Sequence, residues 1–425
     1  MLLRSAAALL CAWIAAAPTG AAAELAVDPL PASGVCRAGE EAQFIVRYEA
    51  GTGPRTIRCS IIGGAAPAVV NREVSAASGK FALTHRLEVP GGIVCVAESE
   101  KSGKAAGGVL FSPEKIRPAD PVPDDFDRFW AENLAALDQV NPAAVRREPT
   151  AHQPQGVRVW DVEIPCVGNA PVRGHLAIPE GARPGSLPVE VSFHGAGVVS
   201  ARMPWEAKRL NRILFDVNAH GIPNGRDAEF YREYGRKQLH GYQHWFVNDR
   251  DRIYFKNMVL RACQALRFVR TLPEWDGRNL IVSGGSQGGF QALAAAGLDP
   301  RVSCVVAYVP AVCDVNGFRN GRAPSWPRFQ EAGEYDPVRG GRAARYVDTA
   351  NFASRIRNAA CFVSAGGRDL TSPAVSVYAA FNVIPSENKT IVLRPEGGHE
   401  IPGDLKAEGE RFIRSRLKPV GTGGK

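Results

Sequence analysis

Beyond its N-terminus the sequence has no long apolar segment and no run of like charges. No stretch of about 18 or more apolar residues follows the first residues, which excludes a protein that spans a membrane several times. The 44 glycines have no fixed period, which excludes a collagen-like chain. Lysine and arginine are scattered among acidic residues, so the net charge of +8 indicates a mixed-charge surface and no nucleic-acid partner. With 45% hydrophobic residues, the 425-residue chain is expected to form about two or three globular domains.

The sequence also lacks the cysteine and histidine spacings of metal sites. It has nine cysteines, but none of them forms a CxxC pair, and no Cys/His cluster has zinc spacing. We therefore expect no metal and no other cofactor. Cys59 and Cys95 are the pair that we favour for a disulfide, because an oxidising compartment permits one. Several other cysteines lie in apolar strands, where buried free thiols are common.

The first residues have the pattern of an export signal. Arg4 gives a positive start, residues 6–17 form a short apolar stretch, and residues 21–23 are small residues at a cleavage site. A membrane anchor is the alternative, but the stretch is short and Pro18-Thr19-Gly20 interrupts it. We predict a signal peptide over residues 1–23 and a periplasmic or secreted mature protein without an integral membrane segment.

The next part of the chain predicts a small β domain over residues 24–111. Short segments alternate apolar and polar positions, as in Phe44, Val46 and Tyr48, and turn residues separate them at intervals of about ten residues. This pattern is typical of an antiparallel β-sandwich. It contains no catalytic constellation, so a polymer-binding module and a structural or docking domain are both open. A proline-containing linker follows over residues 112–123.

Residues 124–418 alternate predicted strands with predicted helices. Acidic residues at positions 124, 125 and 127 open a helix, where they complement its dipole. Residues 254–270 have the apolar spacing of an amphipathic helix. The expected strands are residues 157–162, 172–178, 187–193, 213–217, 280–282, 302–308, 361–364 and 390–393, and the last helix is 405–417. Alternating strands and helices predict an α/β fold with a mostly parallel sheet covered on both faces. Residues 419–425 are expected to form a flexible tail.

The most informative segment is Gly284-Gly285-Ser286-Gln287-Gly288. It fits the G-x-S-x-G nucleophile elbow of α/β hydrolases, a sharp strand-to-helix turn that exposes a reactive serine. An apolar strand precedes it, and the helix-forming residues 291–296 follow. Glycines flank the serine because a Cβ there would clash with the adjoining strand and helix. A glycine-rich turn without chemistry is the alternative, but this context favours Ser286 as a nucleophile.

A serine nucleophile needs a base, and the base needs an orienting acid. In α/β hydrolases the chain order is serine, acid, histidine. His399 is the only histidine after Ser286, and it follows the predicted strand 390–393, so we predict that it is the general base.

The acid must lie between the serine and the histidine. Asp369 comes just after the predicted strand 361–364, one strand before the histidine strand, where a carboxylate can reach the far imidazole nitrogen. We predict Asp369 as the acid, with Asp348 and Asp314 as alternatives. Glu400 adjoins the histidine and is expected to be a structural hydrogen-bond acceptor.

Ester hydrolysis also needs donors for the developing oxyanion. One predicted donor is the backbone N–H of Gln287 in the elbow. The other is expected from the loop His194-Gly195-Ala196-Gly197 after the strand 187–193, where we favour the Ala196 N–H. His194 precedes the serine, so it is expected to pack under the loop and not to serve as the base.

Taken together, these motifs resemble the acetyl xylan esterase / cephalosporin-C deacetylase family, carbohydrate esterase family 7, of the α/β-hydrolase superfamily. The similarity extends from about Pro121 to Leu417. It is carried by Asp125-Phe126-Asp127-x-Phe129-Trp130, Gly284-Gly285-Ser286-Gln287-Gly288-Gly289, Leu298-Asp299-Pro300-Arg301-Val302, Val309-Pro310-Ala311-x-Cys313-Asp314, Asp369 with Pro373, Tyr378-Ala379-Ala380-Phe381-Asn382, and His399-Glu400. The resemblance implies an esterase that removes acetyl groups from short sugars and similar small esters without a metal.

The sequence departs from this family near the predicted site. Asn218-Ala219-His220-Gly221 stands where the family has Arg-Gly-Gln, and Ala196 replaces an aromatic residue. Insertions at residues 222–252 and 316–346 carry aromatic side chains that could stack on sugar rings. The candidate substrate-pocket residues are His220, Tyr242, Trp245 and Trp326. Packing of these long loops onto the core is an equally open interpretation. Family members are often cytoplasmic, ring-like hexamers without an N-terminal sandwich, so the oligomeric state of this chain stays open.

Two other functions are compatible with parts of the pattern. A prolyl-oligopeptidase-like peptidase shares the elbow and the triad, but too few residues precede the linker for a propeller of several four-stranded blades. An exported carbohydrate-binding protein with an inactive hydrolase domain is the second, and the complete Ser–Asp–His set argues against it. The favoured prediction is an exported serine esterase that acts on small acetylated carbohydrates or similar esters.

Overall fold

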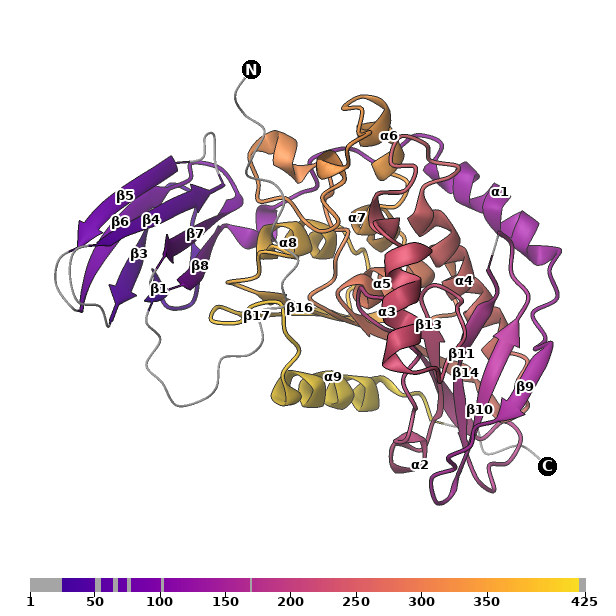
Figure 1. Cartoon of the computed structure of the whole chain (residues 1–425). Helices are drawn as coiled ribbons and strands as arrows, with labels where there is room; N and C mark the ends of the chain where they lie inside the picture. Colours follow the sequence, from indigo (N-terminus) through magenta and orange to yellow (C-terminus); the bar gives the residue numbers. More distant parts are fainter. Residues whose placement is uncertain are drawn as a thin grey trace.

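A computed structural model describes residues 25–49, 55–63, 68–74, 78–100, 103–168 and 170–419 (Figure 1). The predicted signal peptide and residues 420–425 of the predicted tail lie outside the described residues. Within the described part of the chain, no helix combines the length and the apolar composition that a membrane span needs.

The described residues from Leu25 to Phe111 form two facing β-sheets. One sheet has the strand order β1-β3-β6 and the other has the order β2-β8-β7-β4-β5. The strands are β1 (Leu25–Leu30), β2 (Val35–Cys36), β3 (Glu41–Tyr48), β4 (Arg55–Ile62), β5 (Ala68–Val74), β6 (Gly79–Arg86), β7 (Gly91–Ser99) and β8 (Gly103–Phe111). All pairings except β2 with β8 are antiparallel. The predicted small β domain is therefore confirmed.

Alternation in the sequence determines which side chains fill this sandwich. In β3, Phe44 and Val46 are buried while their neighbours Ile45 and Arg47 are not, as a strand with one buried face requires. From the other sheet, Ile57 and Ile93 join the same apolar core.

The favoured disulfide between Cys59 and Cys95 is wrong, because both residues are free thiols in this structure. They lie on the paired strands β4 and β7, where Cys59 faces Ala97 and Cys95 faces Ile61. The two thiols are thus diagonal neighbours, and they hydrogen-bond each other in the buried core. Two small polarisable thiols fill this part of the core without a covalent link.

The larger part of the chain is built on a single mixed sheet. Its strand order is β17-β16-β15-β14-β12-β13-β11-β10-β9. The strands are β9 (Arg146–Pro149), β10 (Val157–Ile164), β11 (Val172–Pro179), β12 (Leu187–Phe193), β13 (Ile213–Asn218), β14 (Trp275–Gly285), β15 (Cys304–Tyr308), β16 (Ala360–Gly366) and β17 (Lys389–Arg394). The strands from β12 to β17 pair in parallel, whereas β9, β10 and β11 form an antiparallel edge. This is the predicted α/β-hydrolase fold.

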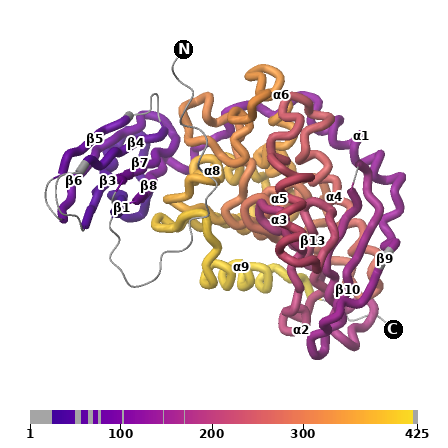
Figure 2. The backbone as a smooth tube through the Cα atoms, in the orientation of Figure 1, coloured from indigo at the N-terminus to yellow at the C-terminus, as the bar shows by residue number. Residues whose placement is uncertain are grey.

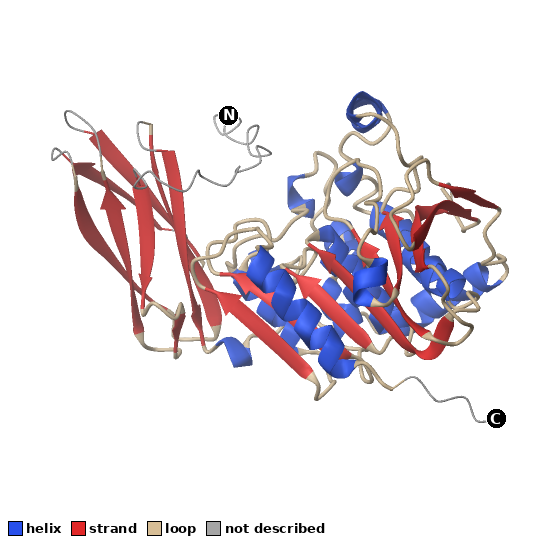
Figure 3. Cartoon of the chain, turned by 90° about the horizontal axis from the view of Figure 1, so that it is seen from below, coloured by secondary structure: helices blue, strands red, loops and turns tan. Residues whose placement is uncertain are grey.

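Helices cover both faces of this sheet (Figures 1 and 3). The α-helices are α1 (Phe126–Asp138), α2 (Ala207–Leu210), α3 (Ala228–Lys237), α4 (Tyr254–Val269), α5 (Gln287–Leu298), α6 (Arg339–Ala344), α7 (Thr349–Ala353), α8 (Ala374–Asn382) and α9 (Gly403–Arg416). Short 3-10 turns are η1 (Pro113–Lys115), η2 (Tyr242–His244), η3 (Gly317–Asn320) and η4 (Phe329–Glu331). Successive strand residues point to opposite faces, so Val282 packs under α5 in the main core while Ile281 packs against α9.

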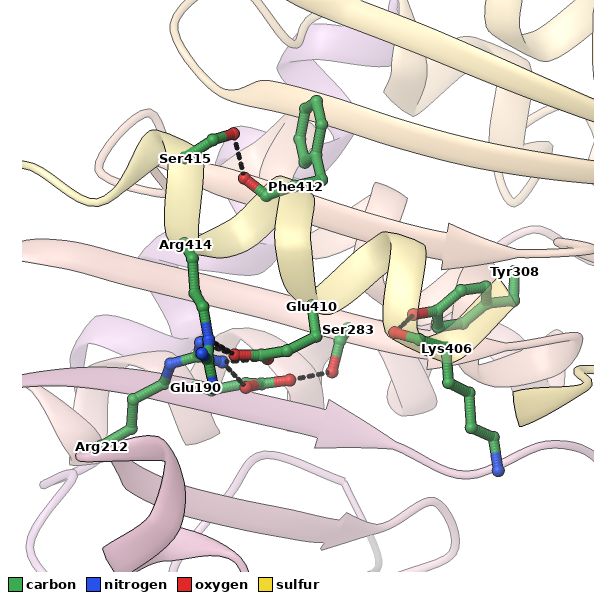
Figure 4. A network of polar contacts seen from close by, with 9 residues as sticks. All are labelled: Glu190, Arg212, Ser283, Tyr308, Lys406, Glu410, Phe412, Arg414 and Ser415. Atoms are coloured by element: carbon green, nitrogen blue, oxygen red, sulfur yellow. Dashed lines mark hydrogen bonds and ion pairs between the residues drawn. The ribbon is translucent and has the colours of Figure 1, made fainter. Parts of the chain in front are cut away.

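Helix α9 is fixed to its face of the sheet by a buried ionic network (Figure 4). The Arg212 side chain is only 1% exposed and donates to Glu190 at 2.8 Å and to Glu410 of α9 at 2.6 Å. The other Glu190 oxygen accepts from the Ser283 hydroxyl at 2.7 Å. Since each carboxylate has a charged or hydroxyl donor, the network compensates for the cost of burying its charges.

The sandwich packs against two loops at the β16 and β17 end of the sheet, as the tube in Figure 2 also shows. Glycines permit a close approach: a Cβ on Gly108 would lie 2.1 Å from the Gly367 carbonyl oxygen, and one on Gly92 would lie 2.9 Å from Val375 Cβ. Arg368 bridges the two parts, since it pairs with Asp28 of β1 at 3.5 Å and with Glu396. The sandwich therefore contacts α8 and the loop after β16, and Gly34 also lies against Pro395 of the loop after β17.

Candidate active site

Ser286 stands at the turn between β14 and α5 in a backbone conformation that is rare for residues with side chains. Its φ is 54° and its ψ is −121°. The turn tolerates no bulk on either side, since a Cβ on Gly284 would lie 2.4 Å from the Gly288 carbonyl carbon and one on Gly288 would lie 2.1 Å from the Phe193 oxygen. Two backbone hydrogen bonds hold the strained residue: Ser286 N–H donates to Tyr308 O at 2.9 Å, and Ala311 N–H donates to Ser286 O at 3.0 Å.

The structure brings the predicted nucleophile, base and acid into one hydrogen-bonded chain. The distance from Ser286 Oγ to His399 Nε2 is 2.8 Å, and His399 Nδ1 lies 2.7 Å from Asp369 Oδ2. The Asp369 side chain is fully buried, and its Oδ1 accepts from the backbone N–H groups of Thr371 and Ser372 at 2.8 Å each. A carboxylate can only accept, so the neutral imidazole carries its proton on Nδ1 and leaves Nε2 free to accept from the serine.

Contacts between the two loops hold the acid and the histidine in register. Gly367 N–H donates to Arg394 O, and Arg368 N–H donates to Gly397 O, both at 2.8 Å. Glu400 accepts from Gly398 N–H at 3.1 Å, which matches the structural role that the sequence suggested for it.

The alternative acids are engaged elsewhere. Asp348 accepts from the backbone N–H groups of Asp314, Val315 and Ala350 at 3.0, 2.9 and 2.9 Å, and it caps α7. Burial, followed by the nearby Asp314 charge, raises the pKa of Asp348 to about 7. Asp314 itself is buried, pairs with Arg322 and accepts from Ala119 N–H. Both carboxylates thus organise the segments that follow β15.

The predicted oxyanion donors lie on two elements beside the serine. Gln287 is the first residue of α5, so its N–H belongs to the helix-terminal amides that no helix carbonyl can satisfy. Gly195 lies across from the elbow: a Cβ built on it would be 3.7 Å from Ser286 Cβ. The next residue, Ala196, has an exposed side chain. The positive end of the α5 dipole also favours negative charge at this place.

Two of the four candidate pocket residues, His220 and Tyr242, hydrogen-bond the backbone of Gly197 in this loop. His220 and Tyr242 are buried, with ring centroids 4.6 Å apart, and the Tyr242 hydroxyl donates to Gln287 Oε1 at 2.7 Å. Trp245 is half-buried and donates from Nε1 to His240 O at 3.0 Å. Trp326 is also half-buried, and its backbone N–H donates to Thr371 O at 2.7 Å, two residues after the acid.

Sequence reasoning missed Tyr254. Its hydroxyl lies 2.7 Å from His220 Nδ1, and it begins α4 immediately before the apolar stripe. Nothing in the linear pattern distinguishes a tyrosine at that position from one that only packs, because its partner is 34 residues away.

Comparison with known proteins gives a consistent result. The sequence model described as acetyl xylan esterase (AXE1) matches residues 112–415. The acetyl esterase Axe7A of Xylanibacter ruminicola is 29% identical over 289 residues, which are 67% of this chain and 65% of that protein. The chain thus spans slightly less than two thirds of the length of this curated relative.

Two solved structures share the fold of the larger part. The acetyl xylan esterase from Paenibacillus sp. R4 superposes with a TM-score of 0.61 at 27% identity, covering 72% of this chain and 98% of that one. Acetyl xylan esterase 1 from Thermoanaerobacterium sp. JW/SL YS485 has the same TM-score and coverage at 23% identity, which supports the fold alone.

Proposed function

The chain belongs to the acetyl xylan esterase family, and we propose that it is a serine carboxylic ester hydrolase that removes acetyl groups from acetylated sugars, xylo-oligosaccharides or similar small esters. The observation that carries the catalytic part of this proposal is the continuous chain from Ser286 Oγ through His399 to the buried Asp369, with contacts of 2.8 and 2.7 Å. The acetyl group and the carbohydrate are inferred from the family and from the names of the relatives.

In the proposed reaction, His399 Nε2 accepts the Ser286 proton while Oγ attacks the acetyl carbonyl carbon. The negative charge moves to the carbonyl oxygen, which the N–H groups of Gln287 and Ala196 stabilise. When the intermediate collapses, the bond to the sugar oxygen breaks and His399 returns the proton to that oxygen. Water then attacks the acetyl-enzyme and His399 takes one of its protons. The bond between Ser286 Oγ and the acetyl carbon breaks, His399 returns the proton to Oγ, and acetate leaves.

Asp369 has an electrostatic and orienting role in this scheme. It is fully buried and accepts hydrogen bonds from Thr371 and Ser372 in addition to His399. A carboxylate held in this way keeps the imidazole in the tautomer that accepts from serine, and it stabilises the imidazolium that forms. The mechanism uses no metal or cofactor.

Export to the periplasm or the medium is part of the proposal, and its support is the sequence of residues 1–23. Acetylated oligosaccharides would be met there. The purified protein's N-terminal sequence tests this point: a mature chain that begins at Glu24 is expected, and an intact Met1 would contradict it.

A substrate panel tests the proposed activity. The mature protein is assayed for acetate release from acetylated xylo-oligosaccharides and other acetylated sugars, and with p-nitrophenyl esters of increasing acyl length. We expect acetyl esters to have the highest kcat/KM, with no turnover by Ser286→Ala. Faster hydrolysis of octanoyl than of acetyl esters would contradict the acetyl preference, and cleavage of peptide substrates instead of esters would favour the peptidase alternative.

A further inference from the structure

The loop that carries the proposed oxyanion donor Ala196 has little intrinsic rigidity. Glycines stand on both sides of Ala196, and Gly197 has a φ of 132°, a region that other residues rarely adopt. The Ala196 side chain is exposed and cannot anchor the loop by packing. A loop of this kind must be held by groups outside it if an amide hydrogen is to point at one place during the reaction.

Two buried histidines hold the carbonyl groups on either side of Ala196. His194 Nε2 accepts from Ala219 N–H at 3.0 Å, so the proton of the neutral ring is on Nδ1, which donates to Gly195 O at 2.7 Å. His220 Nε2 lies 3.1 Å from Gly197 O. A carbonyl can only accept, so His220 carries its proton on Nε2, and its Nδ1 accepts from the Tyr254 hydroxyl at 2.7 Å.

These contacts determine peptide orientation. The carbonyl and the N–H of one trans peptide point in opposite directions, so fixing Gly195 O also fixes the direction of Ala196 N–H. The contact with His220 fixes the carbonyl of Gly197, two residues further along the loop. The Tyr242 phenol hydrogen-bonds the backbone of Gly197 as well as Gln287 Oε1, so it links this loop to the residue that carries the other proposed donor.

The surroundings keep both histidines neutral, as this arrangement requires. Burial, then the neighbouring His194 and Arg261, lowers the pKa of His220 to about 3. Burial also lowers the pKa of His194. Burial raises the pKa of Tyr242 and of Tyr254, so both phenols keep the protons that they donate.

We propose that His220 is a positioning residue: by donating to Gly197 O it holds the loop so that Ala196 N–H meets the carbonyl oxygen in the transition state. This inference rests on the proposed esterase function. It also gives a role to the segment Asn218-Ala219-His220, from which the sequence pattern suggested His220 as a candidate pocket residue. In the structure the His220 ring accepts from Tyr254 and contacts Gly197 O of the loop that carries the proposed oxyanion donor.

The test compares three variants of the full mature chain on p-nitrophenyl acetate. His220→Leu removes the donor, His220→Gln offers an amide N–H in its place, and His152→Leu changes an exposed histidine as the matched control. We expect His220→Leu to lower kcat about tenfold to a hundredfold with little change in KM, somewhat less than the loss of an oxyanion donor itself. His220→Gln should recover most of that loss, and His152→Leu should match the wild type.

A second readout reports on the oxyanion site directly. Phenylboronic acid forms a tetrahedral adduct with an active serine, so its inhibition constant should weaken in His220→Leu by about the same factor as kcat. Three results would overturn the inference: a kcat within twofold of wild type, a loss confined to KM, or a glutamine variant as slow as the leucine variant. A loss confined to KM would assign His220 to the substrate pocket instead.

Thermal melting of each variant separates mispositioning from unfolding. If His220→Leu does not fold, Tyr254→Phe tests the same brace with a smaller change, since it removes only the hydroxyl that donates to Nδ1. A severalfold fall in kcat is then expected, and an unchanged kcat would refute the role. A wild-type protein that hydrolyses no ester would instead contradict the proposed function, and this inference would fall with it.

Discussion

Ser286 concentrates strain in a single residue, and the contacts around it explain why the strain persists. Its positive φ is enforced by the close approach of Gly284 and Gly288 to neighbouring backbone and by backbone hydrogen bonds to Tyr308 and Ala311. His399 and Asp369 stand on separate loops, and contacts between those loops bring the two side chains to this serine. Substitutions of Ser286, His399 and Asp369 are therefore expected to affect one shared function.

The first such prediction concerns the proposed triad. Ser286→Ala and His399→Ala should each lower kcat by about a thousandfold or more, because either change alone disables the same proton-coupled attack. The double variant should be barely slower than either single one. Steady-state kinetics on p-nitrophenyl acetate measure this, with Glu400→Gln as a comparison that should lose much less. If the fold-decrease in kcat of the double variant equalled the product of the two single decreases, the two residues would act independently.

The second residue-scale prediction concerns Asp348. Its pKa is about 7 in the folded protein against an ordinary value of 3.8, mainly because it is buried. Because the pKa of Asp348 is raised on folding, its contribution to the free energy of unfolding is fully present below pH 3.8. That contribution is lost as the pH rises to about 7. Asparagine does not titrate. The stability advantage of the wild type over Asp348→Asn should therefore shrink as the pH rises through this interval.

Urea unfolding of both proteins at pH 5 and pH 8 measures the effect. Asp251→Asn, at a side chain that is 68% exposed, is the control and should cost little at either pH. We also expect Asp348→Asn to keep most of the kcat, because His399 contacts Asp369 instead. An equal stability deficit at both pH values would refute the role of titration.

At the scale of elements, α9 depends on a charged contact as well as an apolar one. Leu405 and Ile413 pack against the sheet, while Glu410 reaches the buried Arg212 beside Glu190 (Figure 4). The helix begins at Gly403, four residues after His399 in the chain. Fixing α9 therefore also fixes one end of the loop that carries the proposed base.

Arg212→Ala should destabilise the protein by about 3 kcal/mol, the lower end of the range for breaking a buried ion pair, because Glu410 is partly exposed. The cost arises because Glu190 and Glu410 lose their shared counter-ion. Chemical denaturation gives the free energy of unfolding. The control is Arg209→Ala, an exposed arginine nearby that should change stability by less than about 0.5 kcal/mol. A similar effect of both changes would argue against the network.

At the scale of the whole molecule, the sandwich and the α/β part share an interface beside the proposed site. Gly108 of β8 lies against Gly367, two residues before Asp369, and Arg368 pairs with both Asp28 and Glu396. Leu110 of β8 belongs to the main apolar cluster of the α/β part. The sandwich is thus packed against the loops that hold the acid and the histidine.

Gly108→Ala tests whether this contact matters. The added methyl would lie 2.1 Å from Gly367 O, so either the sandwich or the loop after β16 must shift. We expect a loss of about 1–3 kcal/mol in stability, as for other overpacked sites, together with a severalfold fall in kcat. Melting and kinetics are compared with Gly333→Ala, where a methyl meets open space. Unchanged melting and kinetics would mean that the two parts are mechanically independent.

The sequence by itself determined the architecture and the identities of the serine, histidine and aspartate that the structure brings together. Strand and helix periodicity is a local property, so the antiparallel pair β10–β11, the helix α4 and the elbow at Ser286 could be predicted from neighbouring residues. Chain order restricted the base to His399, and the position after β16 selected Asp369.

Only the tertiary structure decided which side chains support that site. His220, Tyr242 and Tyr254 come from a strand end, an inserted loop and a helix, and their hydrogen bonds join residues that lie 23 to 45 positions apart. The same holds for the free thiols of Cys59 and Cys95 and for the approach of Gly108 to Gly367. Such contacts depend on how whole elements pack against each other in space. A linear pattern of apolar and polar residues does not specify which individual side chains will meet.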